Sequence, residues 1–213
     1  MIETPAPDTR QRILDTAERL FATHGYHPTS LRKITSEAKV NLAAVNYHFG
    51  SKVGLLQEVF TRRLIPLNRL RKDRLDEVCT LASEENRPPR IDDLLRAFFE
   101  PTVLFCTREP GAIYFSTLVG RTLAEPDDQV RNLFMDHLMP IFNLLLDLVQ
   151  QALPELDRDT LFWRLQFAIG STTHTMRLYG KLQQLQNTQT EPLPIEALLE
   201  QLLQFICKGV RQS

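Results

Sequence analysis

The spacing of apolar residues constrains this 213-residue chain more than any other feature. From about residue 9 to residue 210, apolar side chains recur every three or four positions, which is the period of an amphipathic helix. No segment alternates like a half-buried strand, no Asn-Gly or Asp-Gly pair signals a hairpin, and only eight residues are glycine. The sequence therefore predicts an all-α fold of about nine helices.

Three short helices are predicted at the N-terminus, at about residues 9–24, 31–38 and 42–49. Gly25 ends the first helix, Thr29 or Ser30 caps the second, and Asn41 caps the third. Two short helices crossed at a steep angle and braced by a longer one form a helix-turn-helix. We therefore expect a helix-turn-helix domain at residues 1–52 and a larger helical domain at residues 53–213.

The third helix carries an unusual mixture of side chains in "NLAAVNYHFGSK". Val45 and Phe49 lie four apart and are expected to face inward. The outward or sideways positions are then Ala43, Ala44, Asn46, Tyr47 and His48. Small residues let a helix approach a major groove closely, Asn can read a base edge, and Tyr, His and Lys can bind phosphates. The alternative is a plain three-helix core in which the Tyr and His are only half-buried.

Charge supports the DNA interpretation. Residues 1–65 contain nine Lys and Arg against six Asp and Glu, a net charge of +3, whereas the whole chain has −1. Taken together with the turn and the helix caps, this balance favours a double-stranded DNA operator as the partner of the N-terminal helices.

Composition and short motifs limit the classes of protein to which the chain can belong. With 43% hydrophobic and 24% charged residues, the chain reads as an ordinary soluble protein. No run of about 18 apolar residues and no signal-peptide core is apparent, so we expect a cytoplasmic location and no membrane partner. The three cysteines fit no disulfide framework and no metal spacing. No phosphate-binding loop or nucleophile elbow occurs, so we expect neither an enzyme nor a bound cofactor or metal.

The C-terminal part is predicted to hold six longer helices, at about residues 52–82, 91–107, 112–123, 127–152, 158–186 and 195–210. Pro66 should kink or break the first of these, because proline removes a helical hydrogen bond. The last helix has an apolar stripe wider than one core face needs. Together with small residues of the preceding helix, it predicts a homodimer interface at Ala168, Ser171, Leu199, Leu202 and Ile206. The alternative is that this helix packs only on its own domain.

Residues 9–64 resemble the N-terminal domain of TetR-family transcriptional regulators, through "HGY", "TSLRKI" and "VNYHFGSK" at the family's spacing. The resemblance implies that Thr29 and Ser30 contact phosphate, as do Tyr47, His48 and Lys52. It also implies that Ala43, Ala44 and Asn46 lie closest to the bases.

One position departs from the family pattern. Lys39 stands in the turn where the family usually has glycine. If the backbone there is left-handed, a residue with a side chain costs roughly 1 kcal/mol. Either the strain at Lys39 is tolerated, or the Lys39 side chain adds a contact to phosphate.

Segments such as "LFWRLQFAIGS" are more loosely similar to the branch of the TetR family that contains fatty-acid-responsive repressors. That branch implies a cavity in the C-terminal domain and an elongated anionic effector, such as a long-chain fatty acid or an acyl-CoA. The candidate cavity residues are Phe98, Phe99, Phe115, Arg121, Phe142, Phe167, His174 and Arg177. Other interpretations are a packed core in place of a cavity, an aromatic or cationic drug-like effector, and a helical interaction protein without DNA function.

Overall fold

The computed structural model describes residues 8–108, 111–124, 127–184 and 193–211. Within these ranges the chain is helical, and no strand occurs. The helices are α1 (Thr9–His24), α2 (Leu31–Ala38), α3 (Leu42–Phe49), α4 (Lys52–Glu84), α5 (Ile91–Arg108), α6 (Ala112–Leu123), α7 (Asp128–Ala152), α8 (Arg158–Gln184) and α9 (Ile195–Arg211). The predicted fold class is confirmed, and most helix bounds agree within two residues; the predicted end of α8 at residue 186 lies outside the described residues.

Side-chain caps place the starts of the short helices. The Ser30 hydroxyl accepts a hydrogen bond from the Lys33 amide at 3.1 Å at the start of α2. Asn41 does the same for the Ala44 amide at 2.8 Å at the start of α3. Each cap satisfies one of the amides that a helix leaves unpaired at its N-terminus. The starts of α2 and α3 are therefore fixed by local sequence.

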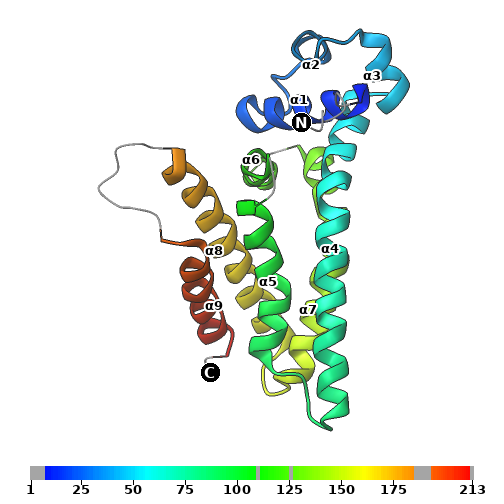
Figure 1. The fold of residues 1–213 in the computed structure, drawn as a ribbon. Coiled ribbons are helices and arrows are strands. Elements are labelled where there is room, and N and C mark those ends of the chain that lie inside the picture. Colours follow the sequence, from blue (N-terminus) through cyan, green and yellow to red (C-terminus); the bar gives the residue numbers. More distant parts are fainter. Residues whose placement is uncertain (1–7, 109–110, 125–126, 185–192, 212–213) are drawn as a thin grey trace, which may run out of the picture.

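Helix α4 connects the N-terminal helices to the rest of the molecule. It runs without interruption from Lys52 to Glu84, and Pro66 lies inside it at an exposed position. Helix α4 is therefore not broken at Pro66, where a kink or a break was predicted. In Figure 1, α4 extends along the whole length of the C-terminal bundle, beside α5 and α7.

Two buried clusters hold the chain together. One joins α1–α3 and the start of α4 to Phe115 and Leu118 of α6 and to Phe134 of α7. The other lies lower in the bundle, among α5, α7, α8, α9 and Leu75 of α4. Helix α6 lies directly beneath α1 (Figure 1). The core of the N-terminal helices is therefore continuous with α6 and α7.

Of the described helices, only α7 is long and apolar enough to cross a bilayer by length and composition. Core helices of water-soluble proteins meet the same criterion, so this is weak evidence for a membrane span.

Candidate nucleic-acid interface and internal cavity

Helix α3 presents a mostly polar and small outer face. Val45 is fully buried and Phe49 is nearly so, as predicted from their spacing. On the other side Ala43 and Asn46 are exposed, and Tyr47 is 86% exposed. The rings of Tyr47 and His48 meet edge to face at 5.1 Å. A tyrosine exposed in this way can contact a phosphate or a base edge.

The structure shows different environments for Ser30 and Thr29, which were both predicted to contact phosphate. Ser30 is exposed, and its hydroxyl keeps a proton to donate while it caps α2. Thr29 is fully buried, and its hydroxyl donates to the Gly25 carbonyl at 2.8 Å. Because that side chain is enclosed, the predicted phosphate contact through Thr29 is wrong. Thr29 instead fixes the loop between α1 and α2.

Lys39 lies in the left-handed region, with φ 53° and ψ 51°, and ends α2. Its side chain is exposed. The Arg12 guanidinium of α1 donates to the Lys39 carbonyl at 2.9 Å and also to the Ala38 carbonyl. These bonds hold the turn in place despite a residue that is strained there.

Lys52, at the start of α4, is partly engaged within the chain. Its ammonium donates to the His27 carbonyl at 3.2 Å and lies 4.2 Å from the centre of the Tyr26 ring. Partial burial lowers the pKa of Lys52. A lysine ammonium has three donors, so a contact to phosphate remains geometrically open.

Two further residues of this region were not singled out from the sequence, namely Leu42 and Gly54. Leu42 is 42% exposed at the first position of α3. A Cβ added at Gly54 would lie 2.3 Å from the Phe49 carbonyl oxygen, so α4 can approach the end of α3 only with glycine there. A glycine one turn inside a predicted helix was the available signal.

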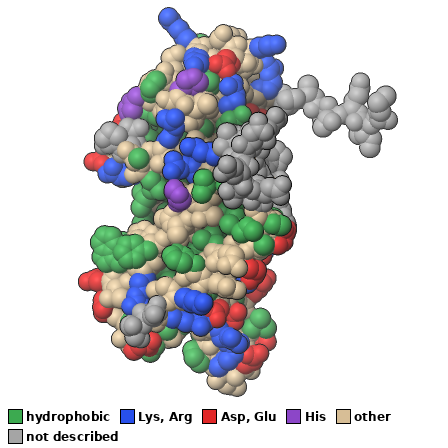
Figure 2. All heavy atoms as spheres, turned by 90° about the vertical axis from the view of Figure 1, so that its left-hand side faces the viewer, with side chains coloured by type: hydrophobic (Ala, Val, Ile, Leu, Met, Phe, Trp, Pro, Cys, Tyr) green, Lys and Arg blue, Asp and Glu red, His purple; other side chains and the backbone are tan. Residues whose placement is uncertain are grey.

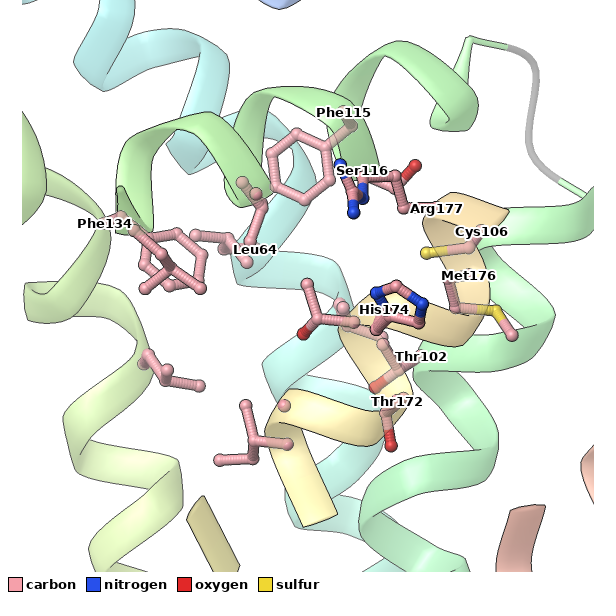
Figure 3. Close-up of a pocket in the computed structure, with 18 of the residues that line it drawn as sticks. Leu64, Thr102, Cys106, Phe115, Ser116, Phe134, Thr172, His174, Met176 and Arg177 are labelled. Carbon is pink, nitrogen blue, oxygen red and sulfur yellow. The ribbon is translucent and has the colours of Figure 1, made fainter. Parts of the chain in front are cut away.

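A large cavity of about 770 Å³ lies in the C-terminal bundle, between α4, α5, α6, α7 and α8. Its volume is typical of small-molecule sites. Seven of the eight predicted residues line it, namely Phe98, Phe99, Phe115, Arg121, Phe142, His174 and Arg177. Figure 3 shows Leu64, Phe115 and Phe134 on one side and His174, Thr102 and Cys106 on the other.

The eighth predicted residue, Phe167, is 68% exposed and does not line the cavity. The sequence reasoning also missed Arg71, which is buried in the cavity wall. Arg71 interrupts an inward stripe of α4 formed by Leu64, Leu67 and Leu75, all of which are buried. That interruption was a readable signal, since a charge rarely occupies a core position without a reason.

Cys106 also lines the cavity. Burial raises the pKa of its thiol to about 12. The thiol is therefore neutral at physiological pH and is not an activated nucleophile. Among the described residues, no three histidine, cysteine or carboxylate side chains gather in a metal-binding arrangement.

The predicted dimer residues mostly face inward. Ala168, Leu199, Leu202 and Ile206 are each at most 7% exposed within a single chain. Ser171 is half-buried, and its hydroxyl donates to the Ala168 carbonyl at 2.9 Å. The four buried residues therefore pack on their own domain and are not available for an interface between chains, and the prediction for Ser171 stays untested.

Other apolar side chains of α8 and α9 remain exposed. Trp163 is 59% exposed, Phe167 68% and Phe205 66%. Figure 2 looks at the side of the molecule that carries α8 and α9. Basic side chains and histidines are frequent in its upper part, and hydrophobic side chains gather around its middle. The rings of Trp163 and Phe167 lie 6.3 Å apart on α8. We refer to these two residues and Phe205 of α9 as the aromatic patch.

The three N-terminal helices expose a short helix, and a long helix joins them to a bundle that contains a cavity. This arrangement places the chain in the class of helix-turn-helix regulators. Residues 13–59 match the family described as "Bacterial regulatory proteins, tetR family". Residues 96–209 match the "Tetracyclin repressor-like, C-terminal domain". The second match alone covers more than half of the chain, and the chain belongs to the TetR family of transcriptional regulators.

Individual relatives agree with this placement. The HTH-type transcriptional regulator SrpR of Pseudomonas putida is 40% identical over 62 residues, which are 29% of this chain and 29% of that protein. The match therefore spans less than a third of the relative. The solved structure of FadR from Bacillus subtilis in complex with stearoyl-CoA has a TM-score of 0.68 at 16% identity, covering 94% of this chain and 98% of that one. KstR2 of Mycobacterium tuberculosis, a ketosteroid transcriptional regulator, has a TM-score of 0.65 at 17% identity over the full length of both chains.

Proposed function

We propose that this chain is a cytoplasmic homodimeric repressor that leaves its DNA operator when a long-chain fatty acid or acyl-CoA fills the cavity. The observation that carries the proposal is the cavity of about 770 Å³, whose upper wall is the helix that supports α1. Residues 1–52 form the DNA-binding domain in this proposal, and residues 53–213 form the effector and dimer domain.

The DNA contacts are proposed for the exposed face of α3 and the ends of its neighbours. Asn46, with Ala43 and Ala44 beside it, meets base edges. Phosphate contacts come from Ser30, Lys39, Asn41, Tyr47, His48 and Lys52. Asn41 uses its side-chain oxygen to cap α3, so its amide hydrogens are the group left for phosphate.

An anionic effector is favoured by the charges around the cavity. Its lining includes Arg71, Arg121, His174, Arg177 and Lys181, and no Asp or Glu among the described residues. A cationic ligand buried there would lack a partner, which is strongly unfavourable. The stearoyl-CoA complex of the similarly folded FadR from Bacillus subtilis agrees with an acyl ligand.

The route from cavity to DNA is short. Phe115 of α6 lines the cavity and belongs to the buried cluster that includes α1. Arg121, another lining residue, donates to the Thr23 carbonyl near the end of α1 at 3.0 Å. An acyl chain that displaces α6 therefore shifts α1 and α3. If the ligand binds this displaced state more tightly, it lowers DNA affinity, and the coupling free energy is the same whichever of the two binds first.

The dimer is proposed to form through the aromatic patch, with α8 and α9 of two chains making a four-helix interface. Exposed aromatic side chains of this size are typical of the centres of interfaces. A twofold dimer also places two α3 helices on successive half-sites of an operator, about 34 Å apart or a multiple of this.

Native mass spectrometry of the purified protein tests the effector class. The protein is incubated with saturated fatty acids of increasing length, with their acyl-CoA thioesters and with a cationic aromatic dye. We expect one acyl chain per cavity and a length optimum, because the volume limits how many methylenes can be buried. Binding of the dye without any acyl ligand would contradict the lipid proposal and leave the family assignment standing.

A further inference from the structure

Arg71 is a buried cation in the wall of the cavity. It is 6% exposed and lies midway along α4. Its guanidinium donates to the Asn68 side-chain oxygen at 2.8 Å, to the Thr102 hydroxyl at 2.6 Å and to the Phe98 carbonyl at 3.3 Å. The Phe98 ring lies 4.5 Å from the guanidinium carbon. All of these partners are neutral, so the positive charge of Arg71 is oriented but not balanced.

No carboxylate forms an ion pair with Arg71 in the part of the chain that the structure describes. The acid on the neighbouring face of α5, Glu100, pairs with Arg74 and Arg96. Burial lowers the pKa of Arg71 to about 10, so the side chain is still protonated at physiological pH. The Cys106 thiol stays neutral and supplies no negative charge.

The arginines of the same helix nearer the DNA-binding unit are balanced in a different way. Arg62 and Arg63 both pair with the buried carboxylate of Glu18. A charge taken out of water is normally compensated in this manner. Among the described residues, Arg71 has no such compensating carboxylate. Arg71 lines the cavity, and two of its five N–H donors are left beyond the three bonds described.

We propose that Arg71 binds the carboxylate of the effector, so that the effector is a free carboxylic acid and not a thioester. The inference rests on the proposed acyl ligand and specifies its chemistry and direction. The acid group pairs with Arg71 beside Thr102, and the hydrocarbon runs past Leu64, Phe115 and Phe134 toward α6 (Figure 3).

Two properties of the site separate an acid from its derivatives. A carboxylate can accept two parallel N–H bonds from a guanidinium, whereas a thioester or ester carbonyl carries no charge and offers a weaker acceptor. Arg71 is also too enclosed to be reached by the phosphates of coenzyme A. The exposed cations Arg121, Arg177 and Lys181 lie elsewhere on the lining and are the alternative place for an anionic head group.

The test compares dissociation constants for palmitate, methyl palmitate, hexadecanol and palmitoyl-CoA on the full-length protein. We expect palmitate to bind about tenfold or more tightly than each of the other three, because the charge-assisted pair forms only with the acid. The wild-type comparison needs no variant and therefore does not depend on how well any variant folds.

Variants then locate the acid group. Arg71→Gln should bring the ester-to-acid ratio close to one, and Arg71→Lys should keep part of the preference. Two matched controls, Arg177→Gln on the exposed part of the lining and Arg74→Gln beside Glu100 outside the cavity, should keep the wild-type ratio. Loss of the ratio in Arg177→Gln alone would overturn the inference.

Equal wild-type binding of acid and ester, or tighter binding of palmitoyl-CoA, would also overturn it and leave the acyl effector in place. Failure of all four compounds to bind would remove the acyl effector itself, and the role of Arg71 with it.

Discussion

The backbone and the side chain of Lys39 favour different amino acids at this position. Its left-handed backbone favours glycine, while its exposed ammonium lies in the turn before α3 and can meet a phosphate. We predict that Lys39→Gly is more stable than Lys39→Ala by about 1 kcal/mol in chemical denaturation, because only glycine relieves the strain. Equal stability of the two variants would show that the turn is unstrained.

The same pair of variants isolates the charge of Lys39. Both remove the ammonium, so both should lose DNA affinity equally and reduce the salt dependence of binding by about one phosphate contact. Unchanged salt dependence would assign Lys39 to the turn alone.

Asn46 and Lys52 are predicted to act differently on DNA. Asn46→Ala should relax base preference at one position of each half-site by about 1–3 kcal/mol, measured across a series of base-substituted operators. Lys52→Ala should weaken binding to all sequences alike. Lys72→Ala is the control, since Lys72 pairs with Asp76 farther along the same helix. A change in base preference for Lys52→Ala would contradict these roles.

At the scale of the elements, a buried ion cluster joins α1 to α4. Glu18 is 2% exposed and pairs with Arg62 and Arg63, while the neighbouring Asp15 pairs with Arg62 at an exposed position. We predict that Glu18→Ala lowers the free energy of unfolding by about 3–5 kcal/mol, because two cations lose their buried partner. Asp15→Ala should cost less than about 1 kcal/mol in the same urea titration. Similar costs for both variants would mean that the cluster is open to water.

The helices themselves were predictable because their boundaries depend on neighbours in sequence. Ser30 and Asn41 cap helices through amides three residues away, and Gly25 and Gly50 end them. Orientation around a helix axis was less predictable. The stripe of α9 includes Ile206, which is buried, and Phe205, which is exposed, and only the packing of α9 on its own domain separates them.

Part of the candidate site was also predictable from neighbours in sequence, and part of it was not. The outer face of α3 follows from the spacing of Val45 and Phe49, whereas Thr29 needed the fold to show that its hydroxyl is enclosed. Seven of the eight predicted residues line the cavity, and four of these seven are phenylalanines. Arg71 was missed although it interrupts the inward leucine stripe of α4, and only the fold shows that Phe98 and Thr102 of α5 hold its guanidinium.

At the scale of the whole molecule, the aromatic patch is predicted to hold two chains together. Trp163→Ser combined with Phe205→Ser should give monomers in sedimentation velocity, since both side chains are mostly exposed in the single chain. Leu81→Ser is the control, because Leu81 is 56% exposed near the far end of α4. A dimer that survives the double substitution would place the interface on another surface.

The central claim is that occupation of the cavity releases DNA, and the most direct measurement titrates the protein–DNA complex with palmitate. DNA selected by the protein from a random pool supplies the operator, and fluorescence anisotropy follows its release. We predict that palmitate releases DNA from the wild-type protein and that Arg71→Gln needs a several-fold higher concentration for the same release. DNA that stays bound while native mass spectrometry shows one palmitate bound per chain would contradict the claim.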